Sequence, residues 1–250
     1  MFFSCGNDVS NKGSEELKAD SLVVESFIAK GEAQILEPVT SEEIVILKKE
    51  GIKLTEIKSE KNKEASIQLN TKKFNVGKNH LSYSVSGVQN YSVAYLANNY
   101  SLSQFKSDDF EVEFLNGNNV FLTFLTDENN VSIKTNKGSV LKSAVLGGVE
   151  SLFSMDQPHL FYYLPQAETL DPILDFYLVN TSISENGNKV KVTINDIEFI
   201  IDKWAAYEVS GLKDQENTVR IQLLDNNNQL VEGPFNDSGE RVFRFVNKTS

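Results

Sequence analysis

The chain from about residue 64 onward is built from short stretches in which apolar and polar residues alternate. Leu81, Tyr83 and Val85 alternate with serines, and the same period of two recurs over residues 190–194 and 197–201. A period of two is typical of a β-strand with one buried face. Clusters of Asn, Asp and Gly separate the stretches, and no long amphipathic helix lies between them. The pattern therefore predicts an all-β chain of antiparallel sheets.

Further apolar stretches extend this prediction. Near-continuous runs over residues 160–164 and 173–179 predict central strands, because both faces of such strands are buried. Asn195-Asp196 predicts the turn of a hairpin, and Asn116 to Asn119 has the composition of a second hairpin loop. The remaining predicted strands are residues 67–69, 91–96, 110–115, 120–125, 140–146, 218–224 and 242–246.

The chain is long enough for two modules of this kind. At 250 residues it accommodates two antiparallel immunoglobulin-like β-sandwich domains of the usual size, predicted here at residues 61–155 and 156–250. Residues 6–60 are predicted as a tether with a small ordered segment before the first domain. Within that segment Ser41 can cap a short helix that ends at Gly51, or residues 44–47 can form a strand.

The N-terminal residues suggest where in the cell the protein is located. Residues 1–5, Met-Phe-Phe-Ser-Cys, resemble the end of a bacterial lipoprotein signal, in which the cysteine is acylated and becomes the mature N-terminus. Cys5 is the single cysteine of the chain, and the polar segment after it has the composition of a tether. The expected location is therefore the cell envelope, with an acylated Cys5 anchoring an outer-membrane lipoprotein that faces the periplasm or the outside.

The charge and the histidine content of the chain exclude some classes of binding partner. Lys and Arg number 24 against 35 Asp and Glu, which gives a net charge of −11. Nucleic acid is an unsuitable partner for such a chain, because binding it needs a basic face. The two histidines, His80 and His159, are not spaced as metal ligands, so neither a metal site nor a cofactor is predicted.

A set of motifs resembles the C-terminal module of uncharacterised, flavobacterial-type envelope lipoproteins of the Bacteroidetes. The matching residues are 173–180, 184–190, 193–196, 202–204, 211–212 and 233–236, with a weaker likeness at 65–69 and 121–125. The resemblance implies an envelope location and a β-sandwich fold, and it implies no activity. The histidine-rich stretch that family members carry is absent from residues 93–110.

Three kinds of candidate chemistry remain. Trp204 with Tyr207, and Tyr162 with Tyr163, offer ring faces to a sugar or a peptide, or are buried in the core. Glu111 and Glu113 share one face of a strand and suggest a paired-carboxylate site, or are the solvent side of that strand. Asp225 to Gln229 and Asp127 to Asn130 offer oxygens to Ca²⁺, or form ordinary turns.

One modification site and one overall function are predicted. Ser21 lies in Asp20-Ser21-Leu22, which resembles the sites at which Bacteroidetes attach O-glycans to exported proteins. No catalytic residues are assigned. We expect a non-enzymatic binding or scaffolding module at the outer membrane with a protein partner or a glycan as ligand, and the alternative is a carboxylate- or Ca²⁺-assisted glycan hydrolase.

Overall fold

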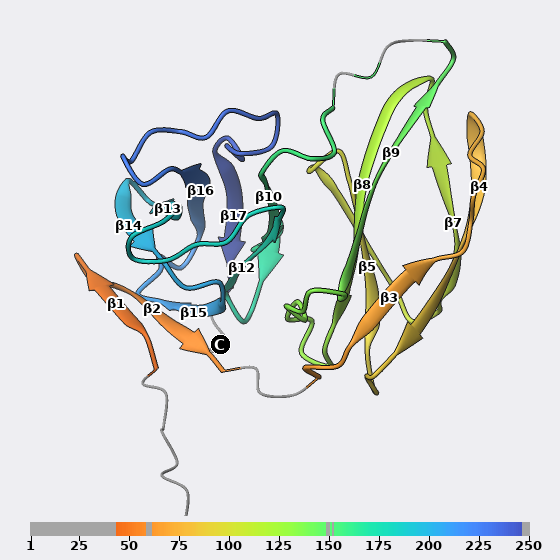
Figure 1. The fold of residues 1–250 in the computed structure, drawn as a ribbon. Helices are drawn as coiled ribbons and strands as arrows, with labels where there is room; N and C mark the ends of the chain where they lie inside the picture. Colours follow the sequence, from red (N-terminus) through yellow and green to blue (C-terminus); the bar gives the residue numbers. More distant parts are fainter. Residues whose placement is uncertain (1–43, 59–61, 149–150, 152, 247–250) are drawn as a thin grey trace, which may run out of the picture. The chain divides into compact units, whose positions relative to one another are not determined.

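The prediction of an all-β chain is confirmed. A computed structural model describes residues 44–58, 62–148, 151 and 153–246, and its regular elements in these ranges are β-strands (Figure 1). All strand pairs are antiparallel except the short parallel pair of β11 and β17. Over the part of the chain described, no helix is long and apolar enough to cross a membrane. Cys5 and Ser21 lie outside the described residues.

Two sheets form the first sandwich, which comprises β3 to β9. Their strand orders are β3-β4-β7 and β6-β5-β8-β9. The bounds are β3 (Ser66–Leu69), β4 (Gly77–Ser86), β5 (Ser92–Ala97), β6 (Ser101–Phe105), β7 (Asp109–Phe114), β8 (Gly117–Thr126) and β9 (Ser139–Leu146).

The second sandwich takes strands from two separate parts of the sequence. One of its sheets has the order β1-β2-β15-β12-β10, and the other has the order β11-β17-β16-β13-β14. The bounds are β1 (Ile46–Lys49), β2 (Ile52–Ile57), β10 (His159–Leu164), β11 (Glu168–Thr169), β12 (Ile173–Val179), β13 (Lys189–Ile194), β14 (Ile197–Ile201), β15 (Ala206–Ser210), β16 (Glu216–Leu224) and β17 (Arg241–Phe245).

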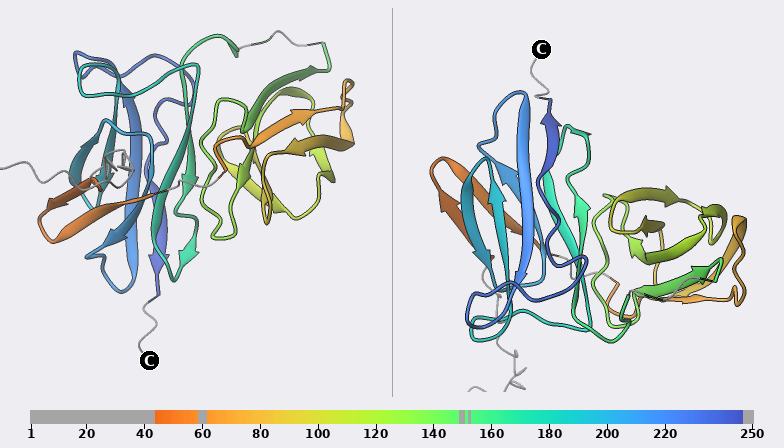
Figure 2. Two further views of the ribbon diagram at one scale, coloured as in Figure 1. Left: turned by 60° about the horizontal axis from the view of Figure 1, so that its bottom comes forward. Right: turned by 90° about the horizontal axis from the view of Figure 1, so that it is seen from above.

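The hairpin of β1 and β2 precedes the first sandwich in sequence and yet completes the second. Strand β2 pairs with β15 from Ala206 opposite Ile57 to Ser210 opposite Lys53, and Figure 2 shows the hairpin beside the strands of the second sandwich. Ile52 and Leu54 are buried in its core. The first sandwich is therefore inserted between β2 and β10. The segment predicted as a helix or a strand before the first domain is a strand that belongs to the second sandwich.

Each sandwich has its own apolar core. Phe110, Phe114 and Phe121 lie in the first core, where alternate residues of the two sheets meet. Val192, Ile221 and similar aliphatic residues fill the second. The described residues from 44 to 246 nevertheless belong to one unit, so the division into domains at residues 155 and 156 stays a prediction.

One predicted hairpin is confirmed and another is wrong. Asn195 and Asp196 have φ of 47° and 68° and join β13 to β14, as the two-residue turn requires. Strands β7 and β8, in contrast, belong to different sheets, so Leu115 and Asn116 form a crossover between sheets and residues 117–119 begin β8. The side chain of Asn119 supports that crossover by accepting from Leu115 N–H at 2.9 Å and donating to Leu115 C=O at 2.8 Å. The amino-acid composition of a turn does not show that one of its amide side chains will pair with the backbone in this way.

A candidate binding groove where the sandwiches meet

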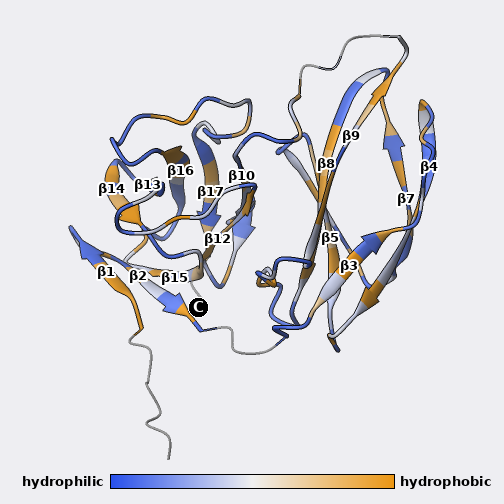
Figure 3. Cartoon of the chain, viewed as in Figure 1, coloured by the Kyte–Doolittle hydropathy of each residue, from blue (hydrophilic) through white to orange (hydrophobic). Residues whose placement is uncertain are grey.

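The two sandwiches share a third apolar cluster. Leu96, Leu122 and Phe124 on the outer face of the β6-β5-β8-β9 sheet pack against Phe161 and Tyr177 on the outer face of β10 and β12. Strands β5, β8, β10 and β12 are therefore buried on both faces, and their sequences are nearly continuous apolar runs. Figure 3 shows the hydrophobic colour over much of β8 and mixed colours along β4. The packing joins the sandwiches through the outer faces of these four strands.

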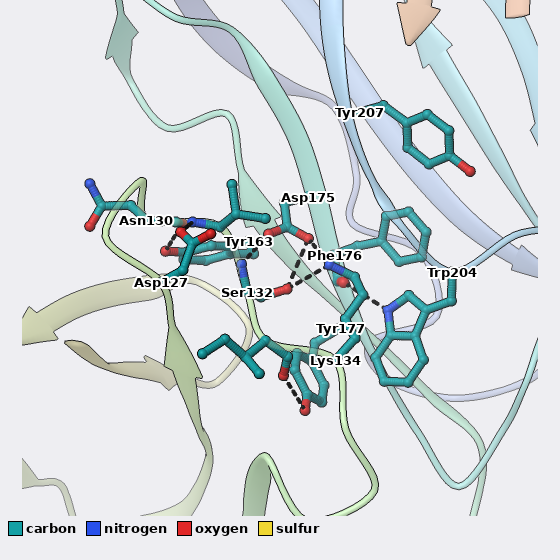
Figure 4. A network of polar contacts seen from close by, with 12 residues as sticks. Asp127, Asn130, Ser132, Lys134, Tyr163, Asp175, Phe176, Tyr177, Trp204 and Tyr207 are labelled. Carbon is teal, nitrogen blue, oxygen red and sulfur yellow. Dashed lines mark hydrogen bonds and ion pairs between the residues drawn. The ribbon is translucent and has the colours of Figure 1, made fainter. Parts of the chain in front are cut away.

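A buried carboxylate reinforces this contact (Figure 4). Asp175 on β12 has no exposed surface, and its oxygens accept from the Ser132 backbone N–H at 2.8 Å and the Ser132 hydroxyl at 3.0 Å. The Lys134 ammonium lies 2.6 Å from the same carboxylate and also donates to the Ser132 hydroxyl. Ser132 and Lys134 belong to the loop between β8 and β9. A buried charge is tolerated only when it is paired and hydrogen-bonded, so this loop is fixed to the second sandwich.

A side-chain amide makes a further connection. Strand β10 is an edge strand, so the outward N–H and C=O groups of that edge need partners from outside the sheet. The Asn99 amide accepts from Tyr162 N–H at 2.8 Å and donates to Leu160 C=O at 3.5 Å. Asn236 repeats the arrangement one step along, accepting from Leu160 N–H at 2.9 Å and donating to Pro158 C=O at 3.0 Å. Two amides thus take the place of a neighbouring strand, and Asn99 brings the first sandwich into this position.

Beside this junction lies a groove of about 1510 Å³, which we call the junction groove. Its floor includes Ile173 and Glu208, which pair directly across β12 and β15 and so share a face of the sheet. Ser210 lies on that face as well, because it is two residues from Glu208. Asp175 is two residues from Ile173, so the floor continues the face on which the first sandwich is docked.

Loops of both sandwiches form the walls. The first sandwich contributes the β4–β5 turn with Gln89 and Asn90 and the β8–β9 loop over residues 127–131. The second contributes residues 170–172, Gly211, Leu212 and Asp214, together with Phe245 at the end of β17. The β8–β9 loop is the one that Asp175 holds, so this wall is fixed by the same contact that joins the sandwiches.

The groove is rich in hydrogen-bond acceptors. Its lining includes five amide side chains and five carboxylates, whereas Lys58 is the cation among the described lining residues. The amides are Asn62, Gln89, Asn90, Asn129 and Asn130, and the carboxylates are Asp127, Glu128, Asp171, Glu208 and Asp214. Amides donate and accept, while carboxylates accept only. A matching ligand therefore supplies donors and carries no negative charge.

Asp127 shows how the wall is built. One of its carboxylate oxygens accepts from Asn129 N–H at 2.9 Å and from Val131 N–H at 3.0 Å. This is the local turn that Asp favours, and Asp225 makes the same pair of bonds to Asn227 N–H and Gln229 N–H. The two stretches weighed as Ca²⁺ ligands thus use these oxygens to shape turns. Among the described residues no group of three or more His, Cys, Asp or Glu lies close enough to hold a metal ion.

The aromatic residues predicted as ligand contacts are packed inside the protein. Tyr162, Tyr163 and Tyr207 are buried, so they present no ring face to a ligand. The Tyr163 hydroxyl donates to Asn130 C=O at 2.8 Å, and the Tyr207 hydroxyl donates to Lys203 C=O at 2.8 Å. Burial raises the pKa of Tyr163, and the nearby Asp175 carboxylate raises it further. These tyrosines do not form a recognition face, because Tyr162 and Tyr207 pack in the core of the second sandwich and Tyr163 packs in the shared cluster.

Trp204 is half-buried and has a structural role. Its indole N–H donates to Phe176 C=O at 3.1 Å, and its ring meets Tyr177 edge-on at 5.1 Å. It contacts the core of the second sandwich and the shared cluster at once. Trp204 and Tyr163 therefore both lie at the junction between the sandwiches (Figure 4). Neither has the exposed ligand-binding role considered for it from the sequence.

The other candidates have local partners. Glu111 lies on the solvent side of β7, 3.8 Å from Lys78, and Glu113 is exposed on the same strand. His80 lies 3.3 Å from Asp109 across the β4–β7 pair. His159 is buried and donates from Nε2 to Ser154 C=O at 2.8 Å, and burial lowers its pKa. Neither glutamate lines the junction groove.

Sequence reasoning missed the aromatic side chain that is most exposed among the described residues. Tyr100 is 75% exposed at the tip of the β5–β6 hairpin. It follows Asn98-Asn99, and a pair of asparagines is a turn signal that places the next residue at a hairpin tip. The apolar runs containing Tyr162 and Tyr163 signalled burial in the same way, since uninterrupted apolar residues leave no polar face.

Comparison with known proteins gives no family. No family model matches the sequence, and no curated protein sequence matches it. Among solved structures, the fibronectin(III)-like modules of Clostridium thermocellum CbhA align with a TM-score of 0.27 at 10% identity, covering 72% of this chain and 94% of that one. A Bacteroides ovatus protein of the mixed-linkage glucan utilization locus, SGBP-B in complex with a mixed-linkage heptasaccharide, gives 0.24 at 10% identity, covering 73% and 71%.

A third similar structure has tandem modules. It contains the two tandem V-type regions of VCBP3, a v-region-containing chitin binding protein, and aligns with a TM-score of 0.21 at 12% identity. The alignment covers 73% of this chain and 99% of that one. TM-scores of this size carry no argument about the ligand of this chain, which must come from its own residues.

Proposed function

We propose that this protein is a cell-envelope lipoprotein that binds a neutral glycan in the junction groove. The observation that carries the glycan assignment is the lining of the groove, where amides and carboxylates outnumber Lys58, the cation among the lining residues that the structure describes. Sugar hydroxyls donate and accept, so they match amide side chains in both directions and give carboxylates the donors they need. A glycan with carboxylate, sulfate or phosphate groups is disfavoured by the same lining.

We also propose that the two sandwiches are immunoglobulin-like modules. Strands β3-β4-β7 form one sheet of the first sandwich, and β10-β12-β15 are neighbours in the same chain order within the five-stranded sheet of the second. This repeated order supports two immunoglobulin-like modules, in which end loops recognise ligands on a rigid framework. The β4–β5 and β8–β9 loops of the first module are at one such end and line the groove.

The junction supports preorganisation of this groove. Asp175 fixes the β8–β9 loop, and Asn99 fixes the β5–β6 hairpin to β10. A binding surface that is already ordered loses less conformational entropy when the ligand arrives. A rigid pair of modules is therefore suited to holding a glycan, with aliphatic floor residues such as Ile57 and Ile173 beneath the C–H faces of the sugar rings.

Affinity gel electrophoresis tests the glycan assignment. The full chain is run through gels containing soluble starch, laminarin, xyloglucan or galactomannan, with polygalacturonate as the anionic counterpart. We expect retardation by at least one neutral polysaccharide and none by polygalacturonate. Retardation by the anionic polymer alone, or by no polymer, overturns the assignment. Release of reducing ends from any polymer overturns the non-enzymatic part of the proposal.

Variants place the ligand in the groove. Gln89→Ala with Asn129→Ala removes two exposed amides from two different loops of the first sandwich, and we expect about tenfold weaker binding from the loss of two hydrogen bonds. The matched control, Gln68→Ala with Asn186→Ala, removes two exposed amides elsewhere and leaves binding unchanged. Binding of oligolysine in place of any polysaccharide, with strong salt dependence, would indicate a basic protein segment as the ligand.

The proposed lipid anchor at Cys5 is tested by a separate experiment. Expression from the genomic locus with the upstream sequence intact is followed by mass spectrometry of the mature N-terminal peptide. We expect Cys5 to be the first residue and to carry acyl chains, and Cys5→Ser to move the protein out of the membrane fraction. An unmodified peptide that retains residues 1–5 rejects the lipoprotein assignment and leaves the groove test unaffected.

A further inference from the structure

A second hollow, away from the residues of the junction groove, surrounds an exposed tyrosine. It measures about 610 Å³, within the usual range for small-ligand sites, and we call it the Tyr100 pocket. Its lining residues are Tyr100, Tyr162, Pro165, Gln166, Ala167, Ser238, Glu240, Arg241 and Val242. Tyr100 comes from the first sandwich and the others come from the second, so the pocket exists only because the sandwiches are joined.

The backbone at Tyr100 is held on both sides. Asn98 and Asn99 have φ of 50° and 54°, and Tyr100 N–H donates to Ala97 C=O at 2.9 Å, which closes the two-residue turn. Asn99 is buried, and its amide is bonded to the edge of β10. The ring of Tyr100 therefore projects from a fixed position even though it is the most exposed of the large apolar side chains described.

Arg241 supports the ring from one side. Its guanidinium lies 5.0 Å from the centroid of the Tyr100 ring and 5.6 Å from that of Tyr162. It donates to Ser238 C=O and to Asn99 C=O, each at 3.0 Å. A cation over one ring face is attracted by the negative charge of that face. Because Tyr100 is 75% exposed, its other face is open to solvent.

We propose that the open face of Tyr100 is a stacking platform for a pyranose ring. Sugar C–H groups carry partial positive charge and pack on the negative face of an aromatic ring. Gln166 and Glu240 line the same pocket and accept from the sugar hydroxyls, while Arg241 supplies donors from its edge. An ordered aromatic platform with a few polar groups at its rim is the arrangement of a small-ligand site.

This pocket binds a sugar whether or not the junction groove does. The two sites share no lining residue. Where one polymer reaches both, the second contact becomes intramolecular and strengthens binding by effective concentration. Loss of one site must therefore leave the other detectable, and this separates the inference from the proposed function.

Saturation-transfer difference NMR on the full chain tests the pocket. The probes are methyl β-D-glucopyranoside, methyl β-D-galactopyranoside and methyl α-D-mannopyranoside. We expect transfer to the ring C–H protons of at least one probe with the natural chain and with Tyr100→Phe, and a loss of about tenfold in affinity with Tyr100→Ala. Tyr100 is exposed, so both variants keep the fold, and unchanged thermal unfolding checks this.

Two control variants distinguish binding in the Tyr100 pocket from binding elsewhere on the protein. Leu115→Ala removes a large side chain that is 67% exposed at the end of β7 and leaves the signal unchanged. The groove variant Gln89→Ala with Asn129→Ala also leaves it unchanged. Absence of transfer from all three probes, or a signal unaffected by Tyr100→Ala, overturns the pocket. A signal lost only in the groove variant overturns the pocket and supports the groove.

Discussion

Asp175 on β12 accepts two hydrogen bonds from Ser132, one from the backbone N–H at 2.8 Å and one from the hydroxyl at 3.0 Å. The two residues belong to different sandwiches, and Lys134 neutralises the carboxylate at 2.6 Å. Such a site is costly to build, because a buried charge must be paired and fully hydrogen-bonded. Its consequence is a β8–β9 loop that cannot move independently of the second sandwich.

Replacing Asp175 with Asn is predicted to destabilise the protein by about 3 kcal/mol, because Lys134 then loses its counter-charge in a largely buried place. Urea denaturation measures the change. In the double variant with Lys134→Met the cost is smaller than the sum of the single costs, since the stranded charge is gone. Strictly additive costs would show that the two side chains do not act as a pair.

Replacing Asn99 is predicted to weaken the contact with β10. Asn99→Gly keeps the positive φ without strain, so its cost of about 1–3 kcal/mol reports the unpaired Tyr162 N–H and Leu160 C=O. Asn99→Ala adds the strain of a left-handed backbone and costs more. Hydrogen exchange at Tyr162 N–H is the specific readout. Exchange as slow as in the natural chain would contradict the assigned bond.

The β1–β2 hairpin is predicted to stabilise the second sandwich despite its place in the sequence. Leu54→Ala removes a fully buried side chain and is expected to cost about 2–5 kcal/mol. Ile46→Ala, on the same hairpin but 57% exposed, is expected to change stability by no more than about 0.5 kcal/mol. Thermal unfolding compares the two. Equal effects would mean that the hairpin is not part of the core.

Alkaline pH is predicted to destabilise the fold through buried tyrosines. Burial raises the pKa of Tyr83 and of Tyr177 from 10.0 to about 12. Between pH 10 and 12 the unfolded chain has released phenolic protons that the folded chain retains, so the free energy of unfolding falls as pH rises. The stabilisation is complete below pH 10 and is lost through pH 12.

Tyr83→Phe isolates one of these groups. Its hydroxyl bonds the Thr123 hydroxyl at 2.8 Å inside the first sandwich. Denaturation at a series of pH values is expected to give a shallower fall for the variant, by at most about 1.4 kcal/mol per pH unit for one proton. A slope identical to that of the natural chain would show that Tyr83 titrates normally.

Local patterns in the sequence predicted the strands well. Alternation over residues 81–85 and 190–201 corresponds to β4, β13 and β14, and the Asn195-Asp196 turn is in place. These features depend on neighbours in sequence, so a single chain reveals them. The continuous apolar run at residues 121–125 likewise indicates a strand that is buried on both faces. The run itself does not indicate which elements cover each face.

Long-range pairing escaped prediction for a physical reason. Strand β2 pairs with β15, and no local signal distinguishes that partner from any other exposed strand edge. The same limit applies to the site. Asp175 sits in an apolar run, and only the loop carrying Ser132 and Lys134 explains a charge there. The apolar run containing Tyr162 and Tyr163 predicted a central strand, and the burial of that strand removes the ligand-contact alternative for both rings.

Hydrogen exchange of the full chain, with and without the neutral polysaccharide that retards it most, tests the account most directly. We expect slower exchange in the β4–β5 turn, in residues 127–131 and in residues 208–212, which together line the junction groove. Exchange along β7 should stay unchanged, because that strand lies outside the groove lining. Protection confined to β7, or no protection at any groove segment, would contradict the claim that the joined sandwiches form a glycan site.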